Sequence, residues 1–442
     1  MSRTHTASTA PRTGTFASLE VRNYRIYATG GLLSNVGTWL QSTAQAWLVL
    51  ELTGSGAALG LTIALQLLPS LLLSPVAGVL ADRVPKRTLL RWLQVGMALP
   101  SALLGALAIA GVVQVWQVYV LTTLFGAARA LEAPARQSFV AEMVGQEHLS
   151  NAVSLNSASF NSGRLVGPAL AGVLIAALGS GVFATGWVIL ANALSYGFVL
   201  LALQLMDPST LHPAPLTGDR RGAVRAGVRY VRSRPDLVLL FACVFFMGSF
   251  GMNFAVTTAL MATEEFGKGA GEFGLLGSIM ATGSLAGALL AARRESPRLR
   301  FIVGAALAFS AVQMLSAVMP TYVTYAAVLP LVGLSVLTAV TTANALIQMS
   351  TDPAMRGRVA SLYLMVFLGS VPLGAPLIGW LGEAFGARWA LAASGLGVGI
   401  GVTLSAVWFM RQDAPIRDAL ARRRRRRNRR PVPTPHEPLD LA

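Results

Sequence analysis

Long uncharged apolar runs, many of more than twenty residues, dominate this sequence and limit what it can fold into. Only 12% of the 442 residues are charged and 54% are hydrophobic, whereas about a quarter of the residues of a soluble protein are charged. About 20 apolar residues span a bilayer as a helix. Spanning segments must satisfy their own backbone hydrogen bonds, so they are helices or closed barrels. The runs lack the two-residue alternation of barrel strands. We therefore expect an all-α membrane protein.

Twelve spanning helices can be delimited from these runs. Connections between them are short, except for one of about thirty residues in the middle. The predicted spans are residues 24–50, 56–81, 88–110, 115–137, 150–178, 181–205, 236–262, 272–292, 299–319, 322–349, 358–384 and 388–410. The predicted organisation is an N-terminal tail (1–22), a first six-helix bundle (23–205), a linker (206–235), a second bundle (236–411) and a disordered Arg-rich tail (412–442).

The basic residues fall almost entirely on one side of this topology. Of 35 Lys and Arg residues, only Lys268 and Arg388 fall in the loops of the other side, and Arg164 lies inside a span. Lys and Arg are retained on the cytoplasmic side of membranes, and an even number of spans places both termini together. We expect both termini to be cytoplasmic, and we interpret the net charge of +16 as a topology signal rather than as a nucleic-acid interface.

The two halves of the chain repeat each other. At one constant offset Gly167 aligns with Gly374 and Gly172 aligns with Gly379. The abundance of glycine makes chance matches common, but these recur at one offset across neighbouring spans. A parallel duplication predicts two pseudo-symmetric bundles of six helices, a construction found in many secondary transporters.

Several classes of chemistry have no support in the sequence. Cys243 is the one cysteine and lies in an apolar run, and the four histidines fall in predicted loops or tails, which argues against a metal site. The chain has only two lysines, and Gly267-Lys268 lacks both the earlier glycine and the following Ser or Thr of a phosphate-binding loop. We expect no cofactor, no metal and no enzyme activity, and transport driven by an ion gradient or by the substrate's own gradient.

The middle connection and the C-terminal tail are strongly basic. Residues 219–235 place arginines on one helical face and valines on another, which favours an amphipathic helix on the anionic inner leaflet. A solvated linker helix is the alternative. The tail at 422–430 is expected to be attracted to lipid or to act as a topology anchor. Nucleic-acid binding is disfavoured because no aromatic residues interleave with its arginines.

The segment "GVLADRVPKR" (78–87) resembles the loop between spans two and three of the major facilitator superfamily. Its motif positions are held by Gly78, Ala81, Asp82, Arg83, Lys86 and Arg87, with Pro85 where glycine is commoner. The stretches 50–60, 132–144, 149–172 and 356–379 are similar to the branch that includes enterobactin-type siderophore exporters and macrolide efflux proteins, the transmembrane secretion effector type. The resemblance covers about residues 20–410 and implies a monomeric transporter of the bacterial inner membrane.

In this family the 78–87 segment implies an ionic latch between the two halves. Gly78 would allow close approach to span eleven, and Asp82 would face the positive N-terminal end of that helix. The basic residues Arg83, Lys86 and Arg87 would pair with acids or lipid phosphates. The alternative is that these basic residues only set the topology.

Charged residues at membrane depth are candidates for function. Arg129 and Glu132 lie three residues apart in span four, so they share a helical face and are within reach of an ion pair. Glu132 is our candidate proton carrier, and a permanent ion pair that braces spans four and five is the alternative. Arg164 lies in span five, where its partner would be Glu132 or an anionic substrate.

Polar residues at helical spacing predict a substrate cavity, although hydrogen bonds between helices are the alternative for any single one. The predicted cavity residues are Asn35, Trp39, Gln41, Gln45, Asn161, Asn253, Thr257, Asn344 and Gln348. The resulting prediction is a proton-coupled exporter of a siderophore, a drug or another amphipathic small molecule, whose partners are that substrate, protons and anionic lipids. An importer with the same fold and a non-transporting sensor or scaffold are the alternatives.

Overall fold

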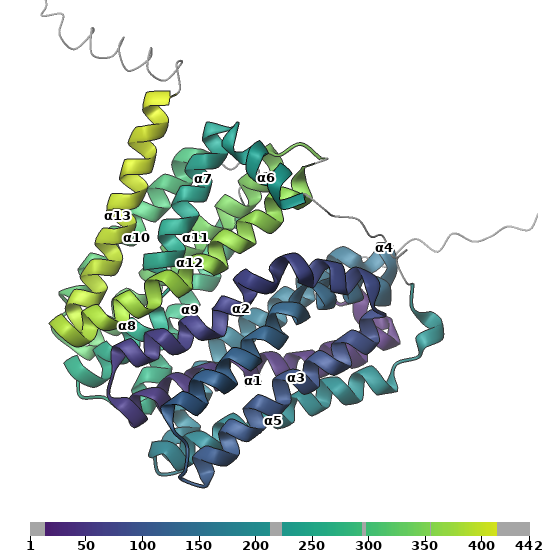
Figure 1. Ribbon diagram of the computed structural model, residues 1–442, viewed down its shortest axis with the longest axis horizontal. Coiled ribbons are helices and arrows are strands. Elements are labelled where there is room, and N and C mark those ends of the chain that lie inside the picture. The colour runs from purple at the N-terminus through teal and green to yellow at the C-terminus, as the bar shows by residue number, and fades with distance from the viewer. Residues whose placement is uncertain (1–13, 213–222, 294–297, 354, 413–442) are drawn as a thin grey trace, which may run out of the picture.

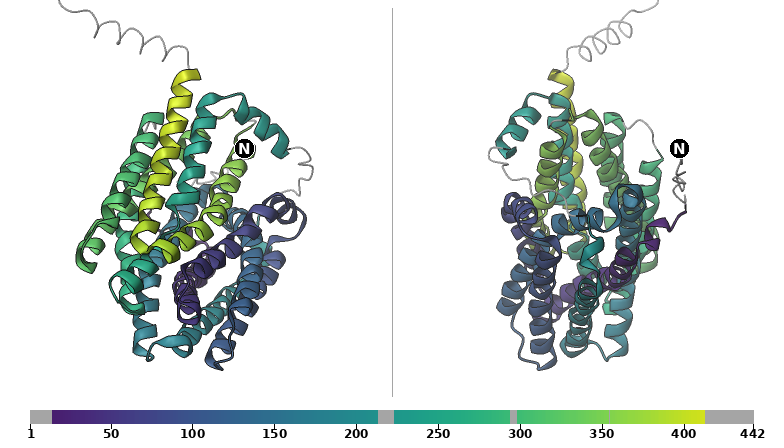
Figure 2. Two further views of the ribbon diagram at one scale, coloured as in Figure 1. Left: turned by 60° about the vertical axis from the view of Figure 1, so that its left-hand side comes forward. Right: turned by 90° about the vertical axis from the view of Figure 1, so that its right-hand side faces the viewer.

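The computed structural model describes residues 14–212, 223–293, 298–353 and 355–412, and nearly all of them lie in helices. Figure 1 shows these helices as two groups, one from the first half of the chain and one from the second. The further views in Figure 2 show the same division. The expected Arg-rich tail beyond residue 412 lies outside the described residues, as do 1–13 of the N-terminal tail.

The first group begins with a short 3₁₀ turn and continues with five helices. In chain order they are η1 (Ala17–Glu20), α1 (Arg22–Thr53), α2 (Gly56–Arg83), α3 (Lys86–Ile109), α4 (Val115–Ala177) and α5 (Gly181–Leu205). α4 includes two of the expected spans, because the residues between them are helical as well. Gly145, with φ 66° and ψ −175°, provides the one non-helical residue at which the chain reverses.

The second group follows η2 (Pro208–Thr210) and the short helix α6 (Ala223–Arg232). Its remaining elements are α7 (Pro235–Phe246), η3 (Met247–Gly251), α8 (Phe254–Leu260), η4 (Met261–Glu265), α9 (Ala270–Ala292), α10 (Leu299–Ala317), α11 (Tyr322–Ser350), α12 (Arg356–Phe385) and α13 (Ala387–Gln412).

Among the described residues, ten helical segments are long and apolar enough to cross a membrane. α4 counts once among them although it contains two expected spans, and Pro235–Glu265 is one segment. α1 is 32 residues long but is not among the ten, since its Asn, Gln, Ser and Thr residues lower its hydropathy. With α4 counted as two and α1 added, these helices account for the twelve expected spans.

The seventh span differs from the regular helix that the sequence predicted for 236–262. It contains two π-helical turns, η3 and η4, and an irregular pair of residues, Met252 and Asn253, before α8. The close approach of α12 accompanies this irregularity: a Cβ atom on Gly374 would lie 2.9 Å from the Cα atom of Ser249. π-turns within helices are frequent at functional sites.

The two groups meet along two reciprocal helix pairs. α2 of the first group packs against α12 of the second, and α4 of the first group packs against α9. Within the groups, α1 packs on α4 and α5, while α10 packs on α11 and α13. This exchange of equivalent helices is what a duplicated six-helix unit predicts.

Small residues allow the close approach in both pairs. A Cβ atom on Gly56 of α2 would lie 2.8 Å from the carbonyl oxygen of Gly379 in α12, and one on Gly274 of α9 would lie 3.0 Å from the backbone nitrogen of Gly172 in α4. The Ser278 hydroxyl also accepts a hydrogen bond of 3.0 Å from the backbone N–H of Ala169. Such contacts, rather than apolar burial, hold helices together in lipid.

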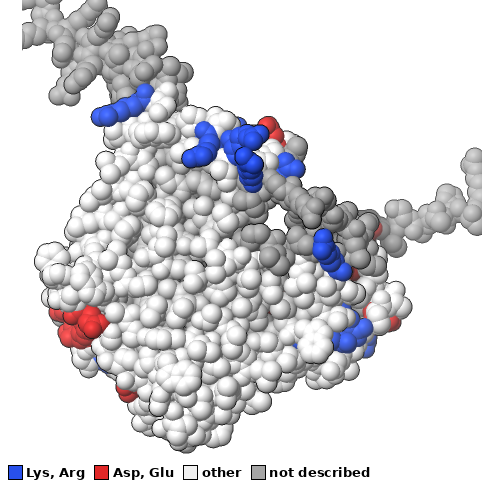
Figure 3. Space-filling model, in the orientation of Figure 1, with Lys and Arg blue, Asp and Glu red and all other residues white. Residues whose placement is uncertain are grey.

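The surface separates charged ends from an uncharged belt. In Figure 3 the basic side chains gather near α6 and the ends of the described chain, an acidic patch lies at the far side, and the wide area between them is uncharged. Large apolar side chains are exposed on the described helices, such as Trp92 of α3 at 71% and Leu194 of α5 at 68%. We call the two ends the basic end and the opposite end. An exposed apolar belt of this extent is what a lipid-facing surface requires.

Candidate functional site

A cavity of about 70 Å³ lies inside the first helix group, between α1, α3, α4 and α5. Its wall combines charged, polar and aromatic side chains, and we call it the charged pocket. It is lined by Arg129, Glu132 and Arg136, by Ser34, Asn35, Thr38, Gln94, Asn156 and Ser159, by Tyr24, Tyr27, Trp39, Phe125, Phe160 and Tyr196, and by Ala28, Gly31, Met97, Leu155 and Val199.

Glu132 forms the ionic centre of the charged pocket. Its side chain is buried, and its Oε1 atom lies 3.2 Å from Nε of Arg136, one helical turn further along α4. The sequence led us to expect Arg129 as the partner within reach. Arg129 does line the same pocket, but the ion pair of Glu132 is with Arg136, because residues four apart also share a helical face. Arg136 was missed, although its spacing was visible in the sequence.

Trp39 and Phe160 form part of the aromatic wall of the pocket, and Arg164 of α4 lies beside them. The ring centres of Trp39 and Phe160 are 5.6 Å apart in an edge-to-face arrangement, and the guanidinium carbon of Arg164 lies 5.7 Å from the Trp39 ring centre. This is the distance of a cation–π interaction. Gly167 makes the arrangement possible, since a Cβ atom there would lie 2.6 Å from that of Trp39.

Three polar atoms in the pocket wall are buried without a hydrogen-bond partner in the described structure: Nε1 of Trp39, Oε1 of Gln94 and Nε of Arg136. Arg136 Nε lies in the ion pair with Glu132, so Trp39 Nε1 and Gln94 Oε1, whose residue is 3% exposed, are the two that lack an ion-pair partner as well. Asn35, by contrast, donates a hydrogen bond of 2.8 Å from Nδ2 to the Ser159 hydroxyl. Buried polar groups usually find partners, so the two unpaired atoms mark this pocket as incomplete in its present form.

Gln41 and Gln45, which we predicted to line the cavity, are buried between helices instead. Gln41 Oε1 accepts a hydrogen bond of 2.5 Å from Asn192 Nδ2 in α5, and Gln45 Nε2 donates one of 2.8 Å to Thr122 Oγ1 in α4. Both amides are therefore used in helix–helix hydrogen bonds, the alternative that the sequence left open.

The five remaining predicted cavity residues lie away from the charged pocket. Asn253 and Thr257 are buried and bond to backbone carbonyls of their own helical segment. Asn161 bonds to the carbonyl of Ser157 in α4, while Gln348 donates to Asn344 on α11. Of the nine predicted cavity residues, the structure places Asn35 and Trp39 in one pocket.

Among the described residues, two basic residues of the 78–87 segment, Lys86 and Arg87, make their polar contacts within the first helix group and not with the second. Lys86 Nζ lies 2.6 Å from Glu142 Oε1 in α4, and Arg87 donates hydrogen bonds of 2.7 to 3.2 Å to the carbonyls of Leu203, Gln204 and Met206 at the end of α5. Arg83 is exposed. The surroundings of Gly78 and of the Asp82 side chain, the two residues expected to face α12, lie outside the described part of the structure.

α6 is docked on the basic end of the second helix group. Its Gly227 packs against the Leu362 side chain of α12, where a Cβ atom would lie 2.8 Å from Leu362 Cδ1. The outward face carries the exposed residues Arg225, Arg229 and Arg232. The expected amphipathic helix therefore exists, but one side of it rests on protein.

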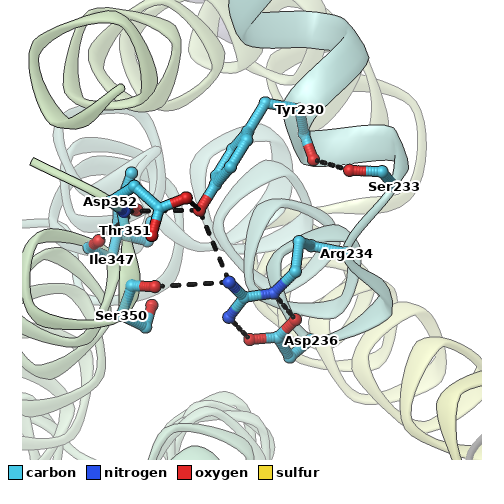
Figure 4. A network of polar contacts seen from close by, with 8 residues as sticks. All are labelled: Tyr230, Ser233, Arg234, Asp236, Ile347, Ser350, Thr351 and Asp352. Atoms are coloured by element: carbon cyan, nitrogen blue, oxygen red, sulfur yellow. Dashed lines mark hydrogen bonds and ion pairs between the residues drawn. The ribbon is translucent and has the colours of Figure 1, made fainter. Parts of the chain in front are cut away.

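A polar network anchors the end of α6, as Figure 4 shows. The Tyr230 hydroxyl donates a hydrogen bond of 3.1 Å to Asp352 and accepts one of 3.3 Å from the Asp352 backbone N–H. Arg234 donates to the Ser350 carbonyl and forms two bonds of 2.6 and 2.9 Å to Asp236. The Asp236 carboxylate holds the pKa of Arg234 above its ordinary value.

At the opposite end a carboxylate joins the two helix groups. Glu383 of α12 accepts a hydrogen bond of 2.5 Å from the Ser55 hydroxyl and one of 3.3 Å from the Ala57 backbone N–H, both at the start of α2. A carboxylate at a helix N-terminus is stabilised by the helix dipole. This contact was not predicted, because Ser55 and Glu383 lie 328 positions apart in the sequence, in different halves of the chain.

The comparisons with known proteins agree with this fold. A family model described as transmembrane secretion effector matches residues 13–434. The chain belongs to this family. The resemblance to the major facilitator superfamily and to this branch of it is confirmed.

Relatives of known name are transporters. The chain is 24% identical over 369 residues to the staphyloferrin A transporter of Staphylococcus aureus, covering 82% of this chain and 90% of the relative. It is 27% identical over 377 residues to the multidrug efflux pump Tap of Mycolicibacterium fortuitum, covering 80% and 88%. The chain is therefore a multi-pass membrane transporter of the major facilitator type.

Solved structures confirm the fold of two six-helix bundles. A bacterial homologue of the lysosomal transporter Spinster, in an inward-facing and occupied conformation, gives a TM-score of 0.72 at 13% identity, covering 90% of this chain and 98% of that one. A D-xylose–proton symporter gives 0.68 at 14% identity, covering 90% and 97%.

Proposed function

We propose that this transporter exports an amphipathic small molecule, a siderophore or a drug, across the bacterial inner membrane in exchange for protons. The observation that carries the proposal is the buried Glu132–Arg136 pair inside a pocket lined by polar and aromatic side chains. A carboxylate at membrane depth is costly even when it is paired, and such residues commonly mark substrate or proton pathways. The names of the relatives, a staphyloferrin A transporter and a multidrug efflux pump, support the cargo class.

The orientation follows from the distribution of charge. The basic end carries the exposed arginines of α6 and of the start of α12, and both ends of the described chain lie there. The positive-inside rule makes this end cytoplasmic. Anionic lipids of the inner leaflet are the proposed partners of the exposed α6 arginines, and the transporter acts as a monomer.

In that orientation the structure is closed toward the outside. The glycine contacts of α2 with α12 and of α4 with α9, and the Ser55–Glu383 hydrogen bond, all lie toward the opposite end. Opening toward the outside would require these contacts to separate and the basic ends to come together. Alternating access by rocking of two repeated bundles has this form.

Glu132 would couple the movement to protons. While it is ionised, its charge is balanced by Arg136. Protonation would remove that balance and leave Arg136 as an uncompensated buried cation, which destabilises the conformation that buries it. Binding and release of a proton at Glu132 would therefore shift the equilibrium between the two conformations.

The test is the variant Glu132→Gln, which keeps the side-chain volume and removes the titratable group. Uptake of a fluorescent drug substrate into everted membrane vesicles is measured with an imposed proton gradient. The expected result is gradient-driven uptake by the wild type and its loss in Glu132→Gln at equal expression. Glu147→Gln, the same change at an exposed position of the same helix, is the matched control.

Other outcomes would contradict the proposal in different ways. Proton-driven accumulation in right-side-out vesicles would make the protein an importer. Absence of flux of drugs and siderophores in either direction would favour a sensor or scaffold. Full activity of Glu132→Gln would remove Glu132 from the coupling step.

A further inference from the structure

We infer that the charged pocket binds the anionic group of the cargo, a carboxylate or similar oxyanion, between Arg129 and Arg164. This inference rests on the proposed function, because it names the chemical class of the cargo. It starts from the charges in and next to the pocket. Among the described residues these are three guanidinium groups, of Arg129, Arg136 and Arg164, and one carboxylate, of Glu132.

The one carboxylate can balance only one of the three cations. Glu132 is in contact with Arg136. In the part of the chain that the structure describes, Arg129 and Arg164 have no carboxylate within ion-pair distance, although Arg129 lines the cavity and Arg164 lies over the Trp39 ring. An unpaired cation at membrane depth is unfavourable. The binding of an anion would therefore be stabilised by both Arg129 and Arg164.

Arg164 lies next to the wall of the pocket that Arg129 lines. It follows Phe160 by four residues on α4, and residues four apart lie on one helical face. Phe160 lines the pocket and contacts Trp39, and the Arg164 guanidinium covers that same Trp39 ring. Arg129 therefore lines the cavity from the first arm of α4, and Arg164 lies beside the Trp39 wall of the cavity from the second arm.

A further unsatisfied donor favours a ligand that carries hydrogen-bond acceptors. The Nε1–H of Trp39 is buried and has no hydrogen-bond partner in the described structure. A carboxylate has two oxygens and about four acceptor positions, enough for a guanidinium on each side and the indole N–H. Hydrogen bonds between a guanidinium and a carboxylate are roughly twice as strong as neutral ones.

The aromatic residues of the pocket wall favour an anion that also carries a large apolar group. Phe125, Phe160, Trp39 and Tyr196 are aromatic, and Phe125 and Tyr196 also pack on each other with ring centres 6.4 Å apart. Pockets for small molecules typically combine such apolar walls with a few polar groups that fix orientation. A simple inorganic anion would leave this wall unused.

The test compares two probes of nearly equal shape, 1-naphthoate, which is anionic, and 1-naphthamide, which is neutral. The full-length protein is purified into lipid nanodiscs, and both dissociation constants are measured by calorimetry. The wild type is expected to bind naphthoate about tenfold more tightly than naphthamide. Arg129→Gln and Arg164→Gln are each expected to weaken naphthoate binding about tenfold, and naphthamide binding less than about twofold.

Two further variants separate charge from structure. Arg129→Lys and Arg164→Lys keep the positive charge and should keep the preference for naphthoate even if the glutamine variants fold poorly. Arg232→Gln removes an exposed guanidinium on α6 and should leave both affinities unchanged. Equal affinities of the wild type for the two probes, or a preference that survives both glutamine substitutions, would overturn the inference.

Its failure can be told apart from failure of the proposed function. Proton-driven drug efflux without a preference for naphthoate would reject the anion site and leave the exporter intact. A clear naphthoate preference that depends on Arg129 and Arg164, in a protein with no flux in vesicles, would support the site and reject the exporter.

Discussion

Lys86 and Glu142 form a buried ion pair, with Nζ and Oε1 2.6 Å apart and side chains only 7% and 9% exposed. Lys86 is the first residue of α3, and Glu142 lies in α4 just before its reversal at Gly145. The pair therefore ties together the basic ends of two helices of one bundle. The charges of the 78–87 segment serve in part to hold that bundle rigid, whichever way the two bundles move.

Replacing Lys86 should destabilise the protein more than replacing its charged neighbour. Lys86→Met would leave a buried carboxylate without its close cation, at a cost of about 3 kcal/mol in the free energy of unfolding. Denaturant unfolding in detergent measures the change. Arg83→Met, three residues away and exposed, should change the free energy of unfolding by less than about 0.5 kcal/mol. Equal effects of the two variants would contradict a buried ion pair at Lys86.

Tyr230→Phe should release α6 from the second bundle. The variant keeps the ring but removes the hydroxyl that bonds twice to Asp352 and once to Arg234. We expect faster amide hydrogen exchange over residues 223–232, by about fivefold, since a hydrogen bond contributes about 1 kcal/mol. In Ser233→Ala, which removes a hydroxyl bonded only to the Tyr230 carbonyl of its own turn, exchange should stay near the wild-type rate. If Tyr230→Phe exchanges like the wild type, the network does not hold α6.

Glu383→Gln should weaken closure at the opposite end. A neutral amide accepts weaker hydrogen bonds from Ser55 and Ala57 than a carboxylate does, by about 1 kcal/mol, which corresponds to about a fivefold shift in the equilibrium. A cysteine at Ser159, in the pocket wall, reports the shift when Cys243 is replaced by alanine and cells are treated with an impermeant maleimide.

Labelling at position 159 from outside should rise about fivefold in Glu383→Gln. The control is Glu272→Gln at the same end of the molecule. The Glu272 carboxylate accepts a hydrogen bond from the backbone N–H of Gly269, at the start of its own helix α9. Unchanged labelling in Glu383→Gln would show that the Ser55 contact does not contribute to closure.

Gln45→Leu tests whether this amide stabilises the fold or binds substrate. Loss of its hydrogen bond to Thr122 should lower stability by about 0.6 kcal/mol, the average for such bonds between membrane helices. The flux in vesicles should be unchanged. Thr122→Val should have a similar effect, and the double variant should cost less than the two together. A large loss of flux in a stable Gln45→Leu protein would return Gln45 to the substrate path.

The helices were predictable from the sequence because membrane spans depend on local composition. Length and hydropathy delimit ten of the helical segments among the described residues. Hydropathy says less about what happens inside or between spans. It could not reveal the π-turns of 247–251 and 261–265 or the continuation of α4 through residues 138–144, since neither changes the apolar content.

The site was only partly predictable, because polar side chains choose among several nearby partners. Glu132 had Arg129 three residues before it and Arg136 four after it, and only the packed helix decides between them. Gln41 and Gln45 had the same polar character as Asn35, yet helix rotation directs them to α5 and α4 rather than into the pocket. The Ser55–Glu383 contact depends wholly on how the two bundles meet.

The second arm of α4 unites two tasks in a short length of backbone. Phe160 lines the charged pocket and Arg164 lies beside it, while Pro168 and Gly172, within the next two turns, form the seam with α9. Under the proposed function, recognition of cargo and opening of the route therefore depend on the same segment of backbone. A lineage that acquires a new cargo through this segment would then have to re-adjust its gate at the same time, and mutations selected here should alter turnover together with specificity.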